Sequence, residues 1–122
     1  MSIDYGDLAV AFRGKAEDLR ALPAMPSLGA LSVFKSLSSC EGIQKQVRLH
    51  YFASTFQKDA SLTSLAALEG LTELNLYEDA VLDCRPLAGM TALERVEVRT
   101  EEQARAIEED CPGHTFQVNI QP

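Results

Sequence analysis

Two histidines and three cysteines are the side chains of this 122-residue chain that could most readily do chemistry. His50 would need a nucleophile or a carboxylate within reach to act as a general base. Cys111 and His114 form half of a possible zinc site, but no second pair lies at a suitable spacing. The sequence has no nucleophile elbow, no glycine-rich phosphate loop and no paired metal motif. We therefore expect a protein that is not an enzyme and that uses no metal and no cofactor.

The cysteines are odd in number and far apart in the sequence, at Cys40, Cys84 and Cys111. This pattern favours reduced thiols in a cytoplasm over a disulfide framework. We expect each of them to be buried as a small hydrophobic side chain.

Two consecutive stretches of the chain have the same pattern of apolar residues at a fixed offset. At this offset Leu65 of the first stretch corresponds to Leu87 of the second. Self-similarity at a period of about 20–29 residues indicates a repeat architecture in which stacked units share one core. The matching apolar positions are Leu65, Leu68, Leu71, Leu74 and Leu76 in the first stretch, and Leu87, Met90, Leu93, Val96 and Val98 in the second.

The segment from Leu74 to Leu87 reads L-x-L-x-x-D-x-V-x-D-C-x-P-L. It resembles the internalin-like, 22-residue class of bacterial leucine-rich repeats, in which the pattern is L-x-L-x-x-N-x-I-x-D-I-x-P-L. Asp79 stands where that family has asparagine, and Cys84 stands at an apolar position. The resemblance implies an α/β fold: a short solenoid with about six parallel strands on a concave face and helices or tight turns on the convex face. In the family, ligands bind to the concave face.

Weaker copies extend the repeat over nearly the whole chain. They predict strands that begin with an inward side chain at Val10, Leu31, Leu49, Leu74, Val96 and Val118. The spacing is uneven only around Leu49, which lies closer to Leu31 than to Leu74. In this register Leu49 and Tyr51 point inward. The longest interval contains a polar stretch, residues 54–64, which we expect to hold a longer loop or an extra turn of helix.

The repeats predict one domain, with an N-terminal cap over residues 1–21, repeats over 22–99 and a C-terminal cap over 100–122. Thr100 and Gln103 have the spacing of a capping box at the start of a helix, which Pro112 and Gly113 would end. A last alternating strand follows at residues 116–120. This ending is similar to the C-terminal cap of small bacterial leucine-rich repeat proteins and favours a complete small protein.

Side chains next to the inward positions should point out of the concave face. Phe34, Phe52 and Tyr77 then lie on three consecutive strands, and exposed aromatic side chains near arginine are typical of interface hot spots. A register different by one residue would instead bury Phe34 and Phe52 in the core. The predicted partner-binding residues are Phe34, Arg48, His50, Phe52, Asn75, Tyr77, Glu97 and Arg99.

The net charge of −7 is unevenly distributed. Residues 1–61 carry 7 basic and 6 acidic side chains, whereas residues 62–122 carry 4 basic and 12 acidic side chains. An acidic half favours a basic protein partner and disfavours nucleic acid and anionic membranes, although the same charge could serve solubility alone. The sequence has no apolar run of about 20 residues and no signal peptide, so we expect a cytoplasmic protein.

These patterns favour a non-enzymatic protein–protein interaction module that binds a protein partner through its concave face. In size and charge the chain is similar to bacterial immunity or antitoxin-type inhibitors. Two alternatives stay open: a structural protein that self-associates as a homodimer, and, least favoured, an enzyme that uses His50.

Overall fold

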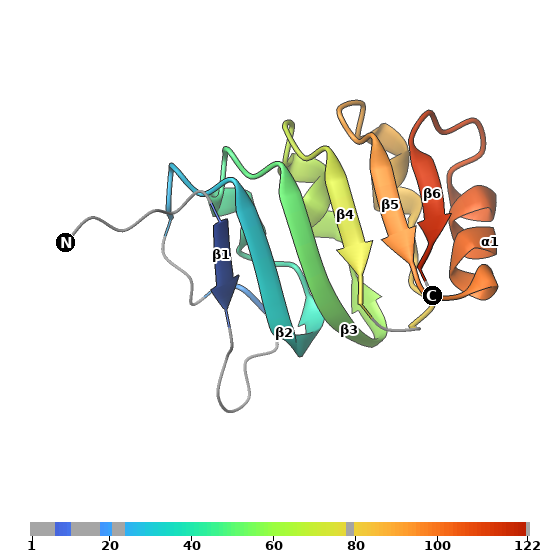
Figure 1. Ribbon diagram of the computed structural model, residues 1–122, viewed down its shortest axis with the longest axis horizontal. Coiled ribbons are helices and arrows are strands. Elements are labelled where there is room, and N and C mark those ends of the chain that lie inside the picture. Colours follow the sequence, from blue (N-terminus) through green and yellow to red (C-terminus); the bar gives the residue numbers. More distant parts are fainter. Residues whose placement is uncertain (1–6, 11–17, 21–23, 78–79, 122) are drawn as a thin grey trace.

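One sheet of six strands forms the front of the molecule (Figure 1). The computed structural model describes residues 7–10, 18–20, 24–77 and 80–121, and only the backbone of residues 7–10 and 34–36. Neighbouring strands are parallel, and their order in the sheet follows their order in the chain. The strands are β1 (Asp7–Val10), β2 (Ala30–Ser39), β3 (Tyr51–Ser61), β4 (Glu73–Leu76), β5 (Arg95–Val98) and β6 (Gln117–Ile120).

Helical segments cover one side of this sheet and lie behind it in Figure 1. They are the short 3₁₀ helices η1 (Ile43–Lys45), η2 (Thr63–Ala67) and η3 (Arg85–Gly89) and the α-helix α1 (Glu101–Asp110). We call the opposite side of the sheet the open face, because no helix of the described residues lies on it. The molecule is a mixed α/β fold built on a parallel sheet, which confirms the α/β part of the predicted fold class. No helix in the described ranges is both long and apolar enough to cross a bilayer.

The backbone hydrogen bonds that join neighbouring strands at their N-terminal ends recur in the same form. The amides of Thr72, Glu94 and Gln117 donate to the carbonyls of His50, Thr72 and Glu94, respectively. The amides of Glu73 and Arg95 share two of the same carbonyls, those of His50 and Thr72. The polar backbone is therefore satisfied in the same way at successive steps along the sheet.

Each step also adds the same set of apolar side chains to a single core. A turn residue, a 3₁₀-helix residue and two strand residues point between the sheet and the helical layer. Burial of one such leucine stabilises the fold by roughly 1.5–3 kcal/mol. The first inward strand position is fully buried in four consecutive strands, at Leu31, Phe52, Leu74 and Val96.

The predicted register of the third strand is wrong. Phe52, not Leu49, pairs with Leu31 and Leu74, so Phe52 points into the core and Tyr51 points out of the open face. Leu49 is also buried, but it occupies the turn position that Leu71 fills in the next step. The chain thus reads Leu49-x-x-Phe52-x-Ser54, and the polar Ser54 at the last core position concealed the match.

Other strand predictions also need correction. The backbone of Leu8, rather than that of Val10, pairs with Leu31, so the pairing of β1 is shifted from the predicted register. The polar stretch at 54–64 forms no long loop: β3 continues to Ser61, and η2 follows. With the first and third strands corrected, the spacing of paired positions becomes nearly uniform, along Leu8, Leu31, Phe52, Leu74, Val96 and Val118.

The C-terminal helix and strand are confirmed. Thr100 Oγ1 accepts a hydrogen bond from the Gln103 amide at 3.2 Å, and Gln103 Oε1 accepts one from the Thr100 amide at 3.0 Å. This is the predicted capping box. Ile107 and Cys111 pack into the core, and β6 pairs with β5. Most of the predicted N-terminal cap lies outside the described residues, as does Asp79.

Candidate functional site

Two rows of side chains cross the open face at right angles to the strands. They follow from the register, because alternate residues of each strand point away from the core. Tyr77 and Arg99 directly follow β4 and β5 and extend the same face. The first row is Ala30, Tyr51, Glu73, Arg95 and Gln117, and the second is Ser32, Ala53, Asn75, Glu97 and Asn119.

Tyr77 spans three strands of this face. Its hydroxyl approaches Ser32 Oγ within 3.5 Å, across the small side chain of Ala53 on the strand between them. The Arg99 guanidinium carbon lies 5.9 Å from the centre of the Tyr77 ring, and Arg99 Nε donates to the Tyr77 carbonyl at 3.1 Å. This geometry is a cation–π contact reinforced by a charge-assisted hydrogen bond. Tyr77 and Arg99 are both half-buried.

Asn75 lies at the centre of the open face and is nine-tenths buried. Its Nδ2 donates to Glu97 Oε2 at 3.1 Å, which fixes the orientation of the amide. Its Oδ1 is buried and has no hydrogen-bond partner among the described residues. Such an unpaired buried acceptor costs about 1–3 kcal/mol.

The Tyr51 hydroxyl lies against the side chains of both Asn75 and Tyr77. Partial burial is the main cause that raises the pKa of Tyr51 to about 12, and the neighbouring Tyr77 adds to it. The hydrogen bond from Asn75 acts in the opposite direction. Tyr51 is therefore a neutral hydrogen-bonding group at any physiological pH.

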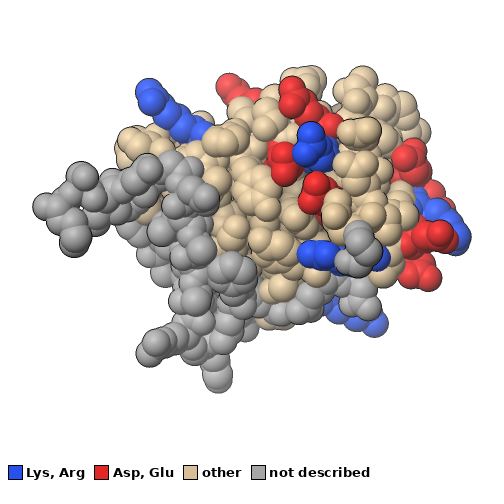
Figure 2. Space-filling view, viewed as in Figure 1, with Lys and Arg blue, Asp and Glu red and all other residues tan. Residues whose placement is uncertain are grey.

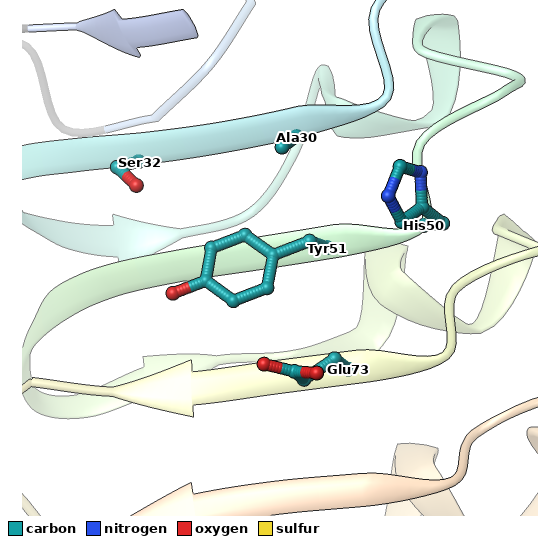
Figure 3. A pocket seen from close by; sticks show the side chains of 5 residues that line it. All are labelled: Ala30, Ser32, His50, Tyr51 and Glu73. Atoms are coloured by element: carbon teal, nitrogen blue, oxygen red, sulfur yellow. The ribbon is translucent and has the colours of Figure 1, made fainter. Parts of the chain in front are cut away.

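A pocket of about 410 Å³ opens beside Tyr51 at the N-terminal ends of β2, β3 and β4 (Figure 3). The small side chains of β2 leave the space, while the Tyr51 ring lies along β3 and the His50 ring stands at the start of that strand. The lining residues are Ala30, Ser32, His50, Tyr51 and Glu73.

Charges on the open face gather toward the C-terminal half. Glu73 on β4 and Arg95 on β5 form an ion pair at 3.5 Å, Glu97 also lies on β5, and Arg99 directly follows that strand. Figure 2 shows basic and acidic side chains over β4 and β5 and at the end that carries α1, whereas the surface over β3 is mainly uncharged. The acidic surplus is concentrated on α1, which contributes Glu101, Glu102, Glu108, Glu109 and Asp110.

The structure brings four predicted site residues together on the open face, and His50 lines the pocket at one edge of that face. Phe52 is wrong as a binding residue, because it is fully buried and packs edge-to-face against Phe56, with ring centres 6.3 Å apart. His50 and Arg48 are exposed but precede β3 rather than lie on it. The side chain of Phe34 lies outside the described part of the chain. The four residues on the open face are Asn75, Tyr77, Glu97 and Arg99.

Four further residues of the open face, Tyr51, Ser32, Glu73 and Arg95, are not among the predicted site residues. Ser32, Glu73 and Arg95 lie next to the predicted inward positions Leu31, Leu74 and Val96, and Tyr51 lies next to an inward position once β3 is placed correctly. The regular interval could have found Tyr51, because Phe52 lies almost midway between Leu31 and Leu74 in the sequence, whereas Leu49 does not.

The cysteines and His114 are used structurally. Cys111 Sγ donates to the Cys84 carbonyl at 3.1 Å, and burial is the main cause that raises the pKa of the Cys40 and Cys84 thiols to about 12. His114 stacks on Phe116, with one ring nitrogen 2.8 Å from the Phe116 carbonyl and the other 2.9 Å from Glu108 Oε1. The Cys111 and His114 side chains thus face different partners. Within the described ranges, no three His, Cys, Asp or Glu side chains lie close enough together to hold a metal ion.

No family model matches this chain, and no curated protein matches its sequence.

Proposed function

We propose that this protein is a non-enzymatic protein–protein interaction module with a leucine-rich-repeat solenoid, and that its open face is the concave binding surface. The regular recurrence of core positions and of strand hydrogen bonds supports the solenoid. The resemblance of residues 74–87 to the internalin-like repeat supports its class.

One observation carries the binding role. Half-buried tyrosines surround an asparagine whose buried Oδ1 has no partner among the described residues, at the centre of a face that no described helix covers. Aromatic side chains held rigidly beside arginine supply contact area at little entropic cost, and they are enriched in interface hot spots.

The partner that we propose is a basic protein met in the cytoplasm, as for an immunity or inhibitor-type protein. The charges on α1 and the chain's net charge of −7 would attract it at long range. The open face itself has nearly balanced charges, so short-range recognition would depend on its aromatic and amide groups. We therefore expect salt to slow association more than it speeds dissociation.

Site-specific photo-crosslinking in cells of the source organism tests this proposal. A benzophenone side chain replaces Arg95, which is exposed on the open face, or Ala88, which is exposed in η3 on the opposite side. We expect a discrete protein adduct from position 95 and none from position 88. Adducts from position 88 alone, or the same adducts from both, would place the interface elsewhere.

A second candidate function, self-association, is favoured by a different observation. Ile120 of β6 occupies an inward position beside Val98 but is 48% exposed, whereas Val98 is fully buried. Pairing of β6 with a second copy would cover this side chain. Sedimentation equilibrium over a range of concentrations tests it: a dimer that Ile120→Lys abolishes would support self-association, and a monomer at all concentrations would exclude it.

A further inference from the structure

The pocket beside Tyr51 has the shape and chemistry to hold one long side chain of a partner. Its volume is about 410 Å³, and it is open to solvent on a face that we propose as the binding surface. Its walls are the Tyr51 ring and His50, and its floor is formed by Ala30 and Ser32 on β2.

The charge of the pocket suits a cation. Glu73 is the one carboxylate among its lining residues, and no lysine or arginine lines it in the part of the chain that the structure describes. The Arg95 guanidinium reaches Glu73 only at 3.5 Å, and both side chains are partly exposed. An exposed ion pair of this kind contributes little and leaves the carboxylate able to accept further hydrogen bonds.

Tyr77 and Tyr51 differ in the charge of the side chain beside them on the open face. Tyr77 has Arg99, which lies at the corresponding place after the next strand and covers the Tyr77 ring with a guanidinium. The residue that pairs with Tyr51 on the next strand is Glu73, an anion. Tyr77 therefore has a cation from its own chain. The Tyr51 ring and the Glu73 carboxylate are placed to bind a cation from another molecule together.

We propose that this pocket binds an arginine side chain of the protein partner, an inference that rests on the proposed interaction function. A guanidinium can stack on the Tyr51 ring while it donates to the neighbouring Glu73 carboxylate, which a lysine ammonium cannot do with the same planar fit. The Tyr51 hydroxyl contacts Asn75, so the unpaired Oδ1 lies at the margin of the same cluster.

Titration of the full isotope-labelled chain with short peptides tests this assignment by NMR. The probes are acetyl-Gly-Xaa-Gly-amide peptides with arginine, lysine or citrulline at Xaa, the last being an uncharged analogue of arginine. We expect the arginine peptide to give saturable shifts at the amides of Ser32, His50, Tyr51 and Glu73. The lysine peptide should bind more weakly, and the citrulline peptide should leave these amides unshifted.

Variants distinguish binding of the arginine peptide in the pocket from non-specific attraction of a cationic peptide to an acidic protein. Glu73→Gln should weaken arginine-peptide binding about two- to fivefold, as expected for one partly exposed charge pair. Glu69→Gln removes the same charge from an exposed turn at another pocket and should leave binding unchanged. Tyr51→Phe should retain the arginine preference, and Tyr51→Leu should lose it. Thermal melts establish that each variant is folded.

The outcomes distinguish this inference from the proposed function. Equal binding of citrulline or lysine, shifts confined to α1, or equal losses in the two glutamine variants would overturn the arginine assignment. A crosslink from position 95 without arginine shifts would retain the interaction function and reject the pocket's role. Arginine-specific shifts without any crosslink would support the pocket and count against the proposed function.

Discussion

The two halves of the sheet differ in how strictly they keep the repeat. From η2 to β5, each step has the same short strand, the same 3₁₀ helix and apolar residues at every core position. The steps around β2 and β3 have strands of 10 and 11 residues with shifts in pairing, and they place the polar Gln46 and Ser54 in the core. The irregular half nevertheless supplies most of the Tyr51 pocket. Three of its five lining residues, Ala30, Ser32 and Tyr51, lie on β2 and β3.

Gly42 shows how the irregular half is held together. It has φ +103°, and a Cβ atom there would come within 2.3 Å of the Leu19 backbone. Ser64 and Pro86 occupy the corresponding positions before β4 and β5. The first 3₁₀ turn therefore packs directly against an earlier segment, and only glycine permits both this conformation and this close approach.

The largest expected effect tests the register of β3. Phe52→Ala should lower the free energy of unfolding by about 3–5 kcal/mol, because it leaves a cavity in the core. Tyr77→Ala on the open face should cost only about 1 kcal/mol, mainly through the lost contact with Arg99. Urea denaturation measures both, with Leu74→Ala as the matched core control in the regular half. Equal losses for Phe52→Ala and Tyr77→Ala would contradict the buried position of Phe52.

The sequence predicted most of the regular half because there a single alternation fits the apolar residues. It predicted the repeat interval, β4, β5 and the helix and strand that follow them. In β3 two alternations are available, and Leu49 and Tyr51 look as apolar as Phe52. The choice depends on the pairing of Phe52 with Leu31 and Leu74 across the sheet, which is a long-range property. The pocket was not predicted for the same reason, because the predicted register places Tyr51 in the core.

Gln46 provides the next test of the difference between the regular and irregular halves. Its Oε1 accepts a hydrogen bond from the buried Met25 amide at 3.0 Å, at a position that Leu68 and Met90 fill in later steps. Gln46→Leu makes this step resemble the others but leaves the amide unpaired, so we expect a loss of about 1–3 kcal/mol. Urea denaturation gives the loss, and faster hydrogen exchange at Met25 locates it.

Met90→Leu is the control for that experiment, since a volume-conserving apolar exchange costs less than about 1.5 kcal/mol. If Gln46→Leu were as stable as the wild type, the polar side chain would be a tolerated irregularity rather than a required one.

Alkaline pH compares corresponding thiols in the two halves. Burial raises the pKa of Cys40 and of Cys84 to about 12, from an ordinary value of 9.0. The unfolded chain thus loses these protons first, and stability should fall as the pH rises from about 9 toward 12. Each thiol contributes up to about 1.4 kcal/mol per pH unit over that window. Cys40→Ala and Cys84→Ala should each reduce the pH dependence of the urea midpoint between pH 8 and 10 by the same amount. A smaller change for Cys40→Ala would show that the irregular core admits water.

The smallest expected effect concerns the helix that replaces a 3₁₀ turn in the last step. Thr100→Ala removes the acceptor for the Gln103 amide and should cost about 1 kcal/mol, whereas Thr100→Ser retains the oxygen and should cost less. Hydrogen exchange at Gln103 and Ile107 should accelerate, and exchange at Val33 in β2 should not. The helix contacts the neighbouring part of the core: its Asp110 carboxylate accepts from the Cys84 amide at 2.8 Å. If Val33 were to exchange faster by the same factor, the two halves would open as one cooperative unit, and their difference in regularity would have no energetic consequence.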